Sequence, residues 1–341
     1  MRVATYYNNK DVRIEEMPKP KIGPDELLVK TMACGICGSD VMEWYRIKKA
    51  PRVLGHEMSG EIVEIGKNVK DFKVGDRVFV SHHVPCNECR YCLNGHHTVC
   101  RTLHTTNFDP GGFSEFIRVP KINVELGTFL LPDEMSFEEG TFIEPLGCVI
   151  RGQRRADLKK GNTVVVLGSG LSGLLHIQLA RVLGAERIIA TDINEYRMKA
   201  AKKFEADEVI NAKEDVSARV REVNEGRLAD RVIVCTGAVS AIEQALKSVD
   251  GGGTILFFAP TDSGVEIPFP FNEFWMSQAT LTTTYAAAPV DIEEAIEFIR
   301  SRKINVKDMI THRLSLEEIG KGFQLVAEAN ESIKVIVEPH R

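Results

Sequence analysis

The stretch Thr163–Gly173, with the sequence TVVVLGSGLSG, decides how the centre of this chain folds. An apolar, β-branched run leads directly into a G-x-G-x-x-G pattern formed by Gly168, Gly170 and Gly173. A continuous run of this kind is typical of a parallel strand that is buried on both faces. The residues after the glycines have the pattern of a helix. The stretch therefore predicts a strand, a tight turn and a helix, which together begin a βαβ unit.

Each glycine of the pattern can serve dinucleotide binding. The alternative interpretation is that the three glycines only form a tight turn. The first permits the turn, the second lets a pyrophosphate approach the backbone, and the third lets the helix pack closely on the strand. Asp192 ends the next predicted strand about 20 residues later, where a carboxylate binds both ribose hydroxyls and repels a 2′-phosphate. Arg197 either stacks on adenine or lies on a solvated helix face. We therefore expect NAD, bound by Gly168, Gly170, Ser172, Gly173, Asp192 and Arg197.

Strand-like and helix-like segments alternate around Asp192. Strands are expected at 163–167, 187–191, 231–235 and 254–258, and helices at 171–183 and 195–204. Alternation at this spacing predicts βαβ units and a parallel, doubly wound sheet. We assign residues 151–285 to an α/β NAD-binding domain of the Rossmann type.

The first 150 residues have a different pattern, in which short β-branched runs are separated by glycine, asparagine and proline turns. This pattern predicts a mostly-β, partly open barrel-like domain. The pattern at 291–301 predicts a helix, and a last strand is expected at 333–337. We expect residues from about 286 to 341 to complete the first domain. Two domains agree with a length of 341 residues.

Composition excludes several classes of function. The net charge is −5 and no block of like charge stands out, which argues against a nucleic-acid or anionic membrane surface. The first residues lack the apolar core of a signal peptide, and no later run has the length of a membrane span. We therefore expect a cytoplasmic protein with reduced cysteines and a small-molecule partner.

Four of the eight cysteines, Cys86, Cys89, Cys92 and Cys100, lie close together in the sequence. In a reducing compartment this spacing indicates a metal site and not disulfides. Four soft ligands suit a closed, tetrahedral, structural zinc site, because no position is left for water. Coincidental reduced cysteines are one alternative. A redox CxxC pair is another, but it leaves the third and fourth cysteines without a role.

Further potential ligands are scattered over three segments: CGICGSD at 34–40, GHE at 55–57 and IEP at 143–145. Taken singly, each has an explanation in packing. Together with GGFSE at 111–115, the spacing of glycines after the GHE segment and the nucleotide pattern, they follow one order along essentially the whole chain. In this the chain resembles the zinc-containing medium-chain dehydrogenases, which include alcohol, sorbitol and threonine dehydrogenases. The resemblance implies a GroES-like catalytic domain beside the Rossmann domain.

The resemblance also implies roles for individual residues. Cys37 and His56 would bind a second, catalytic zinc, with Glu144 of the Glu-Pro pair as third ligand in the sorbitol and threonine branch. Glu57 would act either as a further ligand or as a residue that holds the ligands in place. Ser39 would relay the proton of the alcohol, the alternative being a structural serine that caps a helix. In this family zinc lowers the pKa of the alcohol, and hydride passes to the nicotinamide.

Three departures argue against a specific assignment to sorbitol. Met42 stands where many relatives have a histidine, the stretch between Cys37 and His56 is short, and Tyr285 is preceded by threonine where sorbitol dehydrogenases have arginine. Tyr285 nevertheless remains a candidate substrate contact.

We expect reversible NAD-linked oxidation of a secondary alcohol of a polyol or sugar-like molecule, in a homo-oligomer that is a tetramer or a dimer. One alternative is a threonine 3-dehydrogenase-like activity, for which Arg46, Lys48 and Lys49 could supply a carboxylate-binding cation or be surface charge. The other alternative is a non-catalytic, NAD-responsive binding protein. The presence of all three implied zinc ligands argues against the latter.

Overall fold

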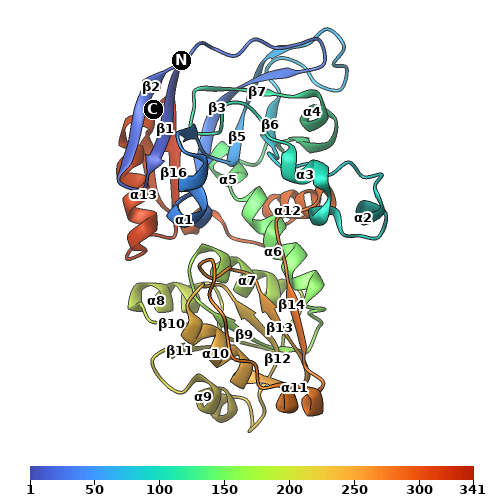
Figure 1. Ribbon diagram of the computed structural model, residues 1–341, viewed down its shortest axis with the longest axis vertical. Coiled ribbons are helices and arrows are strands. Elements are labelled where there is room, and N and C mark those ends of the chain that lie inside the picture. Colours follow the sequence, from blue (N-terminus) through green and yellow to red (C-terminus); the bar gives the residue numbers. More distant parts are fainter. The chain divides into compact units, whose positions relative to one another are not determined.

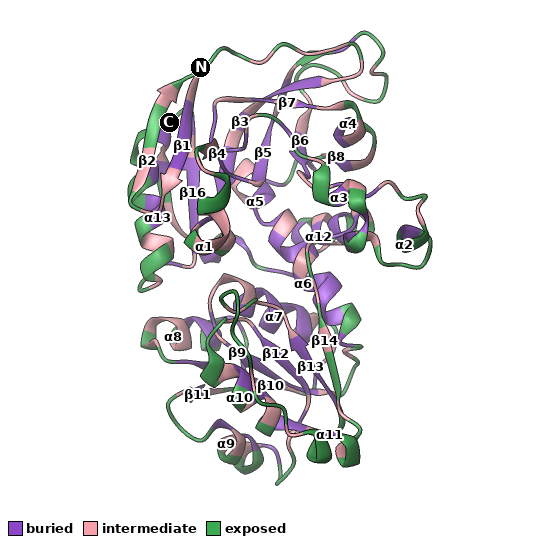
Figure 2. Ribbon diagram, viewed as in Figure 1, coloured by how far each residue is buried: buried purple, intermediate pink, exposed green.

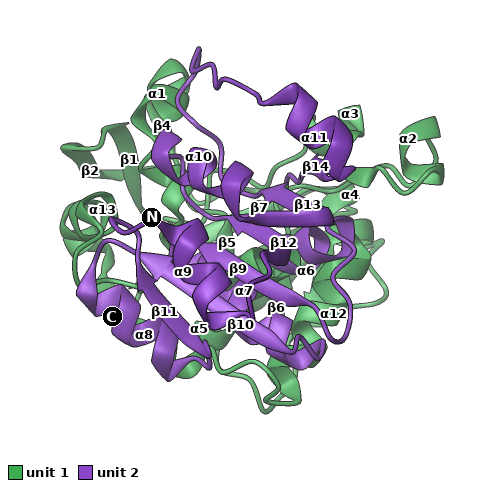
Figure 3. Cartoon of the chain, turned by 90° about the horizontal axis from the view of Figure 1, so that it is seen from below, with its two compact units in different colours: residues 1–147, 286–341 green, residues 148–285 purple.

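The structure, a computed structural model, describes all residues from 1 to 341. The chain forms two compact units. Unit 1 consists of Met1–Gly147 and Ala286–Arg341, and unit 2 of Cys148–Tyr285 (Figure 3). The C-terminal segment belongs to unit 1 because its last strand, β16 (Lys334–Glu338), pairs antiparallel with β3 (Leu27–Gly35).

Unit 2 contains a six-stranded parallel sheet in the order β11-β10-β9-β12-β13-β14 (Figure 1). From the first strand, β9, the chain adds two strands on one side and then three on the other, so the sheet is doubly wound. The strands are β9 (Thr163–Leu167), β10 (Arg187–Asp192), β11 (Glu208–Asn211), β12 (Ala229–Val234), β13 (Val249–Phe257) and β14 (Thr280–Thr283). The helices are α6 (Ile143–Arg155), which begins in unit 1, α7 (Leu171–Val182), α8 (Glu195–Lys203), α9 (Val216–Val223), α10 (Val239–Ser248) and α11 (Phe271–Ser277). The expected doubly wound α/β fold is confirmed.

The core of unit 2 explains why these segments are strands. Every residue of β9 is buried, as a parallel strand with both faces covered requires. Val165 and Leu167 pack in one cluster with Ile189 of β10 and Val232 of β12. Figure 2 shows the central strands as buried and the outer faces of the helices as more exposed. The switch in strand order lies between β9 and β12, the position where open α/β sheets bind ligands.

Unit 1 is mostly β-structure, with a three-stranded sheet β2-β1-β4 and a seven-stranded sheet that follows the path β15-β16-β3-β5-β6-β8, with β7 on β3. The remaining strands are β1 (Arg2–Asn8), β2 (Asp11–Glu16), β4 (Arg52–Val53), β5 (Glu57–Ile65), β6 (Arg77–Val80), β7 (Phe116–Val119), β8 (Thr128–Leu130) and β15 (Ile310–Ser315). The α-helices are α1 (Glu43–Arg46), α2 (Arg90–Leu93), α3 (Arg101–Thr105), α4 (Lys121–Gly127), α5 (Phe137–Gly140), α12 (Pro289–Arg300) and α13 (Ile319–Glu328). The 3₁₀ turns are η1 (Gly38–Asp40), η2 (Ile47–Lys49), η3 (His97–Val99), η4 (Lys307–Met309) and η5 (Leu316–Glu318).

The antiparallel pair β3–β5 positions the chemistry of unit 1. Gly35, the last residue of β3, stands opposite Glu57, the first residue of β5. Cys37 follows β3 and His56 precedes β5, so this register brings the two side chains to the same end of the strand pair. Strand β5 begins at Glu57, which pairs with Gly35 of β3 and is buried within the sheet.

None of the helices combines the length and the apolar character that crossing a bilayer requires.

Candidate active site

Cys37, His56 and Glu57 form a group of potential metal ligands, with one ligand atom of each within 4.8 Å of the others. Cys37 caps the 3₁₀ turn η1, and its Sγ accepts a hydrogen bond from the Ser39 backbone N–H at 3.4 Å. Burial and the Glu57 carboxylate raise the pKa of the Cys37 thiol in the absence of metal. A thiolate, an imidazole and a carboxylate are the ligand types that zinc accepts, so this donor set fits a zinc ion.

Asp40 holds two members of this group in place. Its Oδ2 accepts the backbone N–H of Cys37 at 3.1 Å, and its Oδ1 lies 3.5 Å from Nδ1 of His56. Burial lowers the pKa of His56, but Asp40 and Cys37 outweigh this effect and raise the pKa well above its ordinary value. A carboxylate on one ring nitrogen directs the other toward a metal, which is the usual support of a ligating histidine. Asp40 is therefore a positioning residue.

Glu57 pairs with Lys334, and both side chains are completely buried. Lys334 Nζ donates to Oε2 of Glu57 and to the carbonyl of Thr141 at 3.2 Å, and it lies 4.9 Å from the ring centre of Phe142. Oε1 of Glu57 has no hydrogen-bond partner, as is expected of an oxygen that faces a metal site. Gly35 makes room for the pair, because a Cβ there would lie 2.4 Å from Oε2 of Glu57 and from Nζ of Lys334.

Ser39 contacts an arginine and does not cap a helix. Arg46 Nη2 donates to Ser39 Oγ at 2.9 Å, and Arg46 Nε donates to the Ser39 carbonyl at 2.8 Å. The same guanidinium contacts Asp40 Oδ1 at 3.1 Å. Met42 is the N-cap of α1, and its side chain makes no capping hydrogen bond. Arg46, and not the residue at position 42, is therefore the side chain that contacts Ser39.

Two predicted residues lie outside this group of ligand atoms. Glu144 is in the first turn of α6 and is half-buried. Tyr285 is the last residue of unit 2 and 47% exposed. The geometry of Cys37, His56 and Glu57 therefore offers a complete three-ligand set without Glu144.

The four cysteines Cys86, Cys89, Cys92 and Cys100 form the second group of potential ligands. The Sγ atoms of Cys89 and Cys92 lie 3.6 Å apart, those of Cys86 and Cys100 lie 3.5 Å apart, and none forms a disulfide. Tetrahedral zinc with Zn–S bonds of about 2.3 Å requires sulfurs about 3.8 Å apart, so the arrangement fits zinc. Hydrogen bonds from backbone N–H groups lower the pKa of the Cys86 thiol. Burial raises the pKa of Cys100, but hydrogen bonds outweigh burial and lower this pKa to about 6. Burial raises the pKa of Cys92 to about 12.

The glycine pattern of unit 2 forms a cradle that side chains would fill. Gly168 has a φ of +94°, a conformation that favours glycine. A Cβ on Gly173 would lie 1.9 Å from the Gly168 carbonyl oxygen, so only glycine permits this approach of α7 to the turn. Gly170 caps α7 and Ser172 lies in its first turn, where backbone N–H groups attract phosphate. These residues fit a dinucleotide pyrophosphate.

Asp192 ends β10, and both of its carboxylate oxygens accept backbone N–H groups. Oδ2 accepts from Ser169 at 2.8 Å and Oδ1 accepts from Asn194 at 2.9 Å. These contacts fix the carboxylate beside the glycine turn. Arg197 lies over the same turn, because a Cβ built on Gly170 would be 3.6 Å from Nη1 of Arg197. The buried Nε of Arg197 has no hydrogen-bond partner. Both predicted residues therefore border the cradle.

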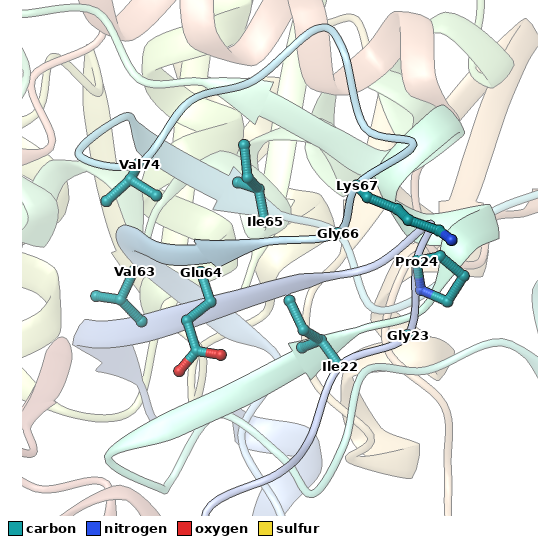
Figure 4. A pocket seen from close by; sticks show the side chains of 9 residues that line it. All are labelled: Ile22, Gly23, Pro24, Val63, Glu64, Ile65, Gly66, Lys67 and Val74. Atoms are coloured by element: carbon teal, nitrogen blue, oxygen red, sulfur yellow. The ribbon is translucent and has the colours of Figure 1, made fainter.

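A separate surface hollow of about 620 Å³ contains none of these residues (Figure 4). Its walls are the turn at Gly23 and Pro24, the end of β5 and Val74. Of its charged residues, Glu64 is already paired with Lys19 at 3.2 Å. The hollow therefore has no ligand set comparable to those of the two cysteine-containing groups.

From the sequence, Asp40 and Lys334 had no predicted role, and Arg46 was expected either to bind a substrate carboxylate or to be surface charge. Asp40 stands in the CGICGSD segment, so its proximity to Cys37 was a usable signal. Lys334 gave no signal, because 277 positions separate it from its partner Glu57.

Comparison with known proteins places this geometry in a family. Residues 23–128 match the alcohol dehydrogenase GroES-like domain, and residues 173–301 match the zinc-binding dehydrogenase domain. The chain is 34% identical to sorbitol dehydrogenase of Bacillus subtilis, over 100% of this chain and 98% of that protein. It is also 34% identical to a probable D-xylulose reductase A of Aspergillus clavatus, over 96% of this chain and 93% of the relative.

Among solved structures, galactitol-1-phosphate dehydrogenase of Escherichia coli superimposes with a TM-score of 0.87 at 27% identity, covering 99% of this chain and 100% of the other. The sequence-based assignment of the family, of the two-part fold and of zinc and NAD as cofactors is thereby confirmed. The chain belongs to the zinc-containing medium-chain dehydrogenases, in the branch similar to sorbitol dehydrogenase.

Proposed function

We propose that this protein is a zinc-dependent enzyme that reversibly transfers hydride between a secondary alcohol of a polyol or sugar-like molecule and NAD. The observation that carries the proposal is the convergence of Cys37, His56 and Glu57 within 4.8 Å. Three protein ligands leave the fourth position of a tetrahedral zinc for a substrate oxygen. The relatives named for sorbitol, D-xylulose and galactitol 1-phosphate support a polyol as substrate.

Cys37 and His56 hold the catalytic zinc, and Asp40 orients both. The third ligand is Glu57, whose unpartnered Oε1 is available for the metal, while the family resemblance offers Glu144 as the alternative. When bound, zinc lowers the pKa of the substrate hydroxyl. Cys86, Cys89, Cys92 and Cys100 hold a structural zinc, because four thiolates leave no position for substrate.

Ser39 is the hydroxyl that contacts the reacting oxygen. Arg46 donates to one lone pair of Ser39 Oγ, so the second lone pair can accept the proton of the substrate hydroxyl while Ser39 gives up its own hydroxyl proton. Arginine remains protonated in proteins and cannot pass the proton further. The proton therefore leaves Ser39 through water and not through a side chain at position 42 or 46.

Unit 2 is the NAD-binding domain, and unit 1 is the catalytic domain that the C-terminal segment completes. Asp192 selects NAD over NADP, because its carboxylate binds ribose hydroxyls and repels a 2′-phosphate. We place Tyr285 among the substrate contacts on the basis of the family resemblance. The reduced cysteines and the family resemblance support a cytoplasmic homo-oligomer, a tetramer or a dimer.

A substrate panel tests the proposal. Zinc-loaded protein is assayed with polyols, sugars, amino alcohols and aliphatic secondary alcohols, with NADH or NADPH formation as the readout. We expect turnover of polyols with NAD, weak turnover with NADP, and a relaxed preference in Asp192→Ala. The control is Asp250→Ala, a change near the start of β13 at the opposite end of the sheet. Absence of turnover at two zinc ions per chain, or a preference for amino alcohols, would contradict the proposal.

A further inference from the structure

The end of strand β6 brings one more histidine to the candidate zinc site. In the antiparallel pair of β5 and β6, Ser59 stands opposite Phe79. Three residues further along both strands, the same register leads to His56 on one side and His82 on the other. The ring centres of these two histidines lie 4.9 Å apart, with their planes tilted by 50°. The sheet therefore places His82 in contact with a proposed zinc ligand.

The position of His82 is fixed by its neighbours. Nδ2 of Asn123, which is completely buried, donates to the carbonyls of Ser81 at 2.9 Å and of His82 at 3.1 Å. Oγ of Ser81 donates to the carbonyl of His83 at 2.9 Å. The ring of His83 lies 3.8 Å from that of His82 between centres, and the Phe108 ring meets it edge-on at 6.5 Å. These contacts hold the imidazole without engaging its nitrogen atoms.

Neither ring nitrogen of His82 has a hydrogen-bond partner within the chain. Nδ1 is buried, whereas Nε2 is not among the buried unpartnered atoms, and the side chain as a whole is half-buried. Among backbone groups, a buried N–H without a partner is rarer than a buried acceptor without one. The same preference in a neutral imidazole assigns the proton to the accessible Nε2. His82 therefore offers an unused N–H donor beside His56.

Two simpler roles do not account for this donor. His82 does not belong to the group of Cys37, His56 and Glu57, whose ligand atoms lie within 4.8 Å of one another, so it is not a further ligand. Packing alone would be served by an apolar ring, and it leaves the partly desolvated imidazole nitrogens without compensation. A hydroxyl group of a bound substrate would supply the missing partner, because its oxygen accepts a hydrogen bond.

We propose that Nε2–H of His82 donates a hydrogen bond to the substrate hydroxyl next to the reacting carbon, so that the enzyme prefers vicinal diols to simple secondary alcohols. This inference rests on the proposed function and adds a specificity-determining residue. The hydroxyl that reacts occupies the open zinc position, and its neighbour on the chain is the one that comes closest to a ring in contact with His56. A site built to bind a hydroxyl rejects an analogue without it, because its own polar group is then left unpaired.

The experiment compares three alcohols with the same carbon chain: 2-butanol, 1,3-butanediol and 2,3-butanediol. Each has a secondary hydroxyl, and they differ in whether and where a second hydroxyl is present. With the zinc-loaded enzyme and NAD, we expect the highest kcat/KM for 2,3-butanediol. His82→Phe keeps an aromatic ring beside His56 and removes the donor. It should lower the ratio of kcat/KM for 2,3-butanediol to that for 2-butanol by about 5- to 10-fold, the value of one hydrogen bond.

Two further variants define the effect. His82→Gln keeps an N–H donor and should retain part of the preference. His340→Phe is the matched control and should leave the ratio unchanged, since His340 is an exposed histidine that packs against the Phe116 ring at 5.8 Å, outside both groups of ligands. Zinc content is measured in every variant. An equal fall for all three alcohols with loss of zinc would show that His82 only supports His56 and would overturn the inference. A loss confined to 1,3-butanediol would overturn the assignment to the neighbouring hydroxyl.

A binding measurement separates this inference from the proposed function. Calorimetry with the three alcohols is carried out on zinc-loaded protein with NADH bound, for the unmodified chain and for His82→Phe. Weaker binding of 2,3-butanediol to the variant, with 2-butanol unchanged, supports the inference even if none of the alcohols is oxidised. Turnover with the same ratio in both proteins at full zinc content would overturn the inference and leave the proposed function intact. Equal binding without any turnover would overturn both.

Discussion

The two groups of metal ligands in unit 1 are assembled in opposite ways. The four cysteines come from one short loop, and Cys86 and Cys100, at its ends, are 14 positions apart. The group of Cys37, His56 and Glu57 depends on the register of β3 with β5, and Lys334, which supports Glu57, is 277 positions away. The first can close with little loop entropy, whereas the second exists only after the sheet has formed.

The two groups of ligands also differ in the chemistry that they allow. Four thiolates form a closed set, so a metal there contributes to folding. A thiolate, an imidazole and a carboxylate leave one position open, and here the sheet supplies the rigidity that the ligand set lacks. The comparison indicates that the two sites should respond differently to mutation, one mainly in stability and the other mainly in activity.

The largest expected effect is the loss of turnover in Cys37→Ser. Removing this thiolate should reduce the zinc content from two ions per chain to one and abolish activity. NADH binding should remain, because unit 2 has its own core. Metal analysis, turnover and fluorescence titration with NADH check this. Cys148→Ser in α6 is the matched control and should keep two zinc ions; appreciable turnover by Cys37→Ser at one zinc per chain would contradict the assignment.

Cys89→Ser should act on stability. It should also lose one zinc ion, and loss of a structural metal belongs to the changes that cost more than about 4 kcal/mol. At roughly 2–4 °C per kcal/mol for a body of this size, the unfolding transition of unit 1 should fall by on the order of 10 °C. Differential scanning calorimetry with metal analysis tests this. A Cys89→Ser protein with two zinc ions and an unchanged transition would refute the structural site.

Glu57→Gln and Glu144→Gln distinguish the two candidate carboxylate ligands. If Glu57 is the ligand, Glu57→Gln loses catalytic zinc and leaves Lys334 unpaired in the core, at a cost of about 3–5 kcal/mol. The double variant Glu57→Gln/Lys334→Met should recover most of the stability and none of the zinc. Glu144→Gln should retain two zinc ions. The opposite pattern of zinc contents would assign the ligand to Glu144.

The smallest effect is expected for Asp40→Asn, which keeps the shape of the side chain and removes the charge beside His56. Changes of this kind usually lower metal affinity or activity by about 10–100-fold. Competition with a chelator measures the affinity, and kcat/KM is measured at saturating zinc. Asp11→Asn, which breaks an exposed pair with Arg13, is the control. Equal zinc affinity and activity in Asp40→Asn would show that the register of the strands alone positions the ligands.

The sequence by itself was sufficient for the fold of unit 2, the family and the cofactors. The run before Gly168 forms a strand that is buried on both faces, and the glycines stand where β9 meets α7, so these predictions rest on local patterns. The extent of β5 was not predictable in the same way. Glu57 is charged, and it is part of the strand because it pairs with Gly35 in the sheet, where Lys334 balances its buried charge.

Tertiary structure alone decided which side chains support the candidate site. Asp40 and Arg46 are polar residues of a short segment, and nothing in their spacing separates the one that supports His56 from the one that contacts Ser39. Their roles follow from contacts: Asp40 lies beside His56, and Arg46 donates hydrogen bonds to Ser39. The physical reason is that local patterns record the period of strands and helices, whereas pairing of charges depends on which strands become neighbours.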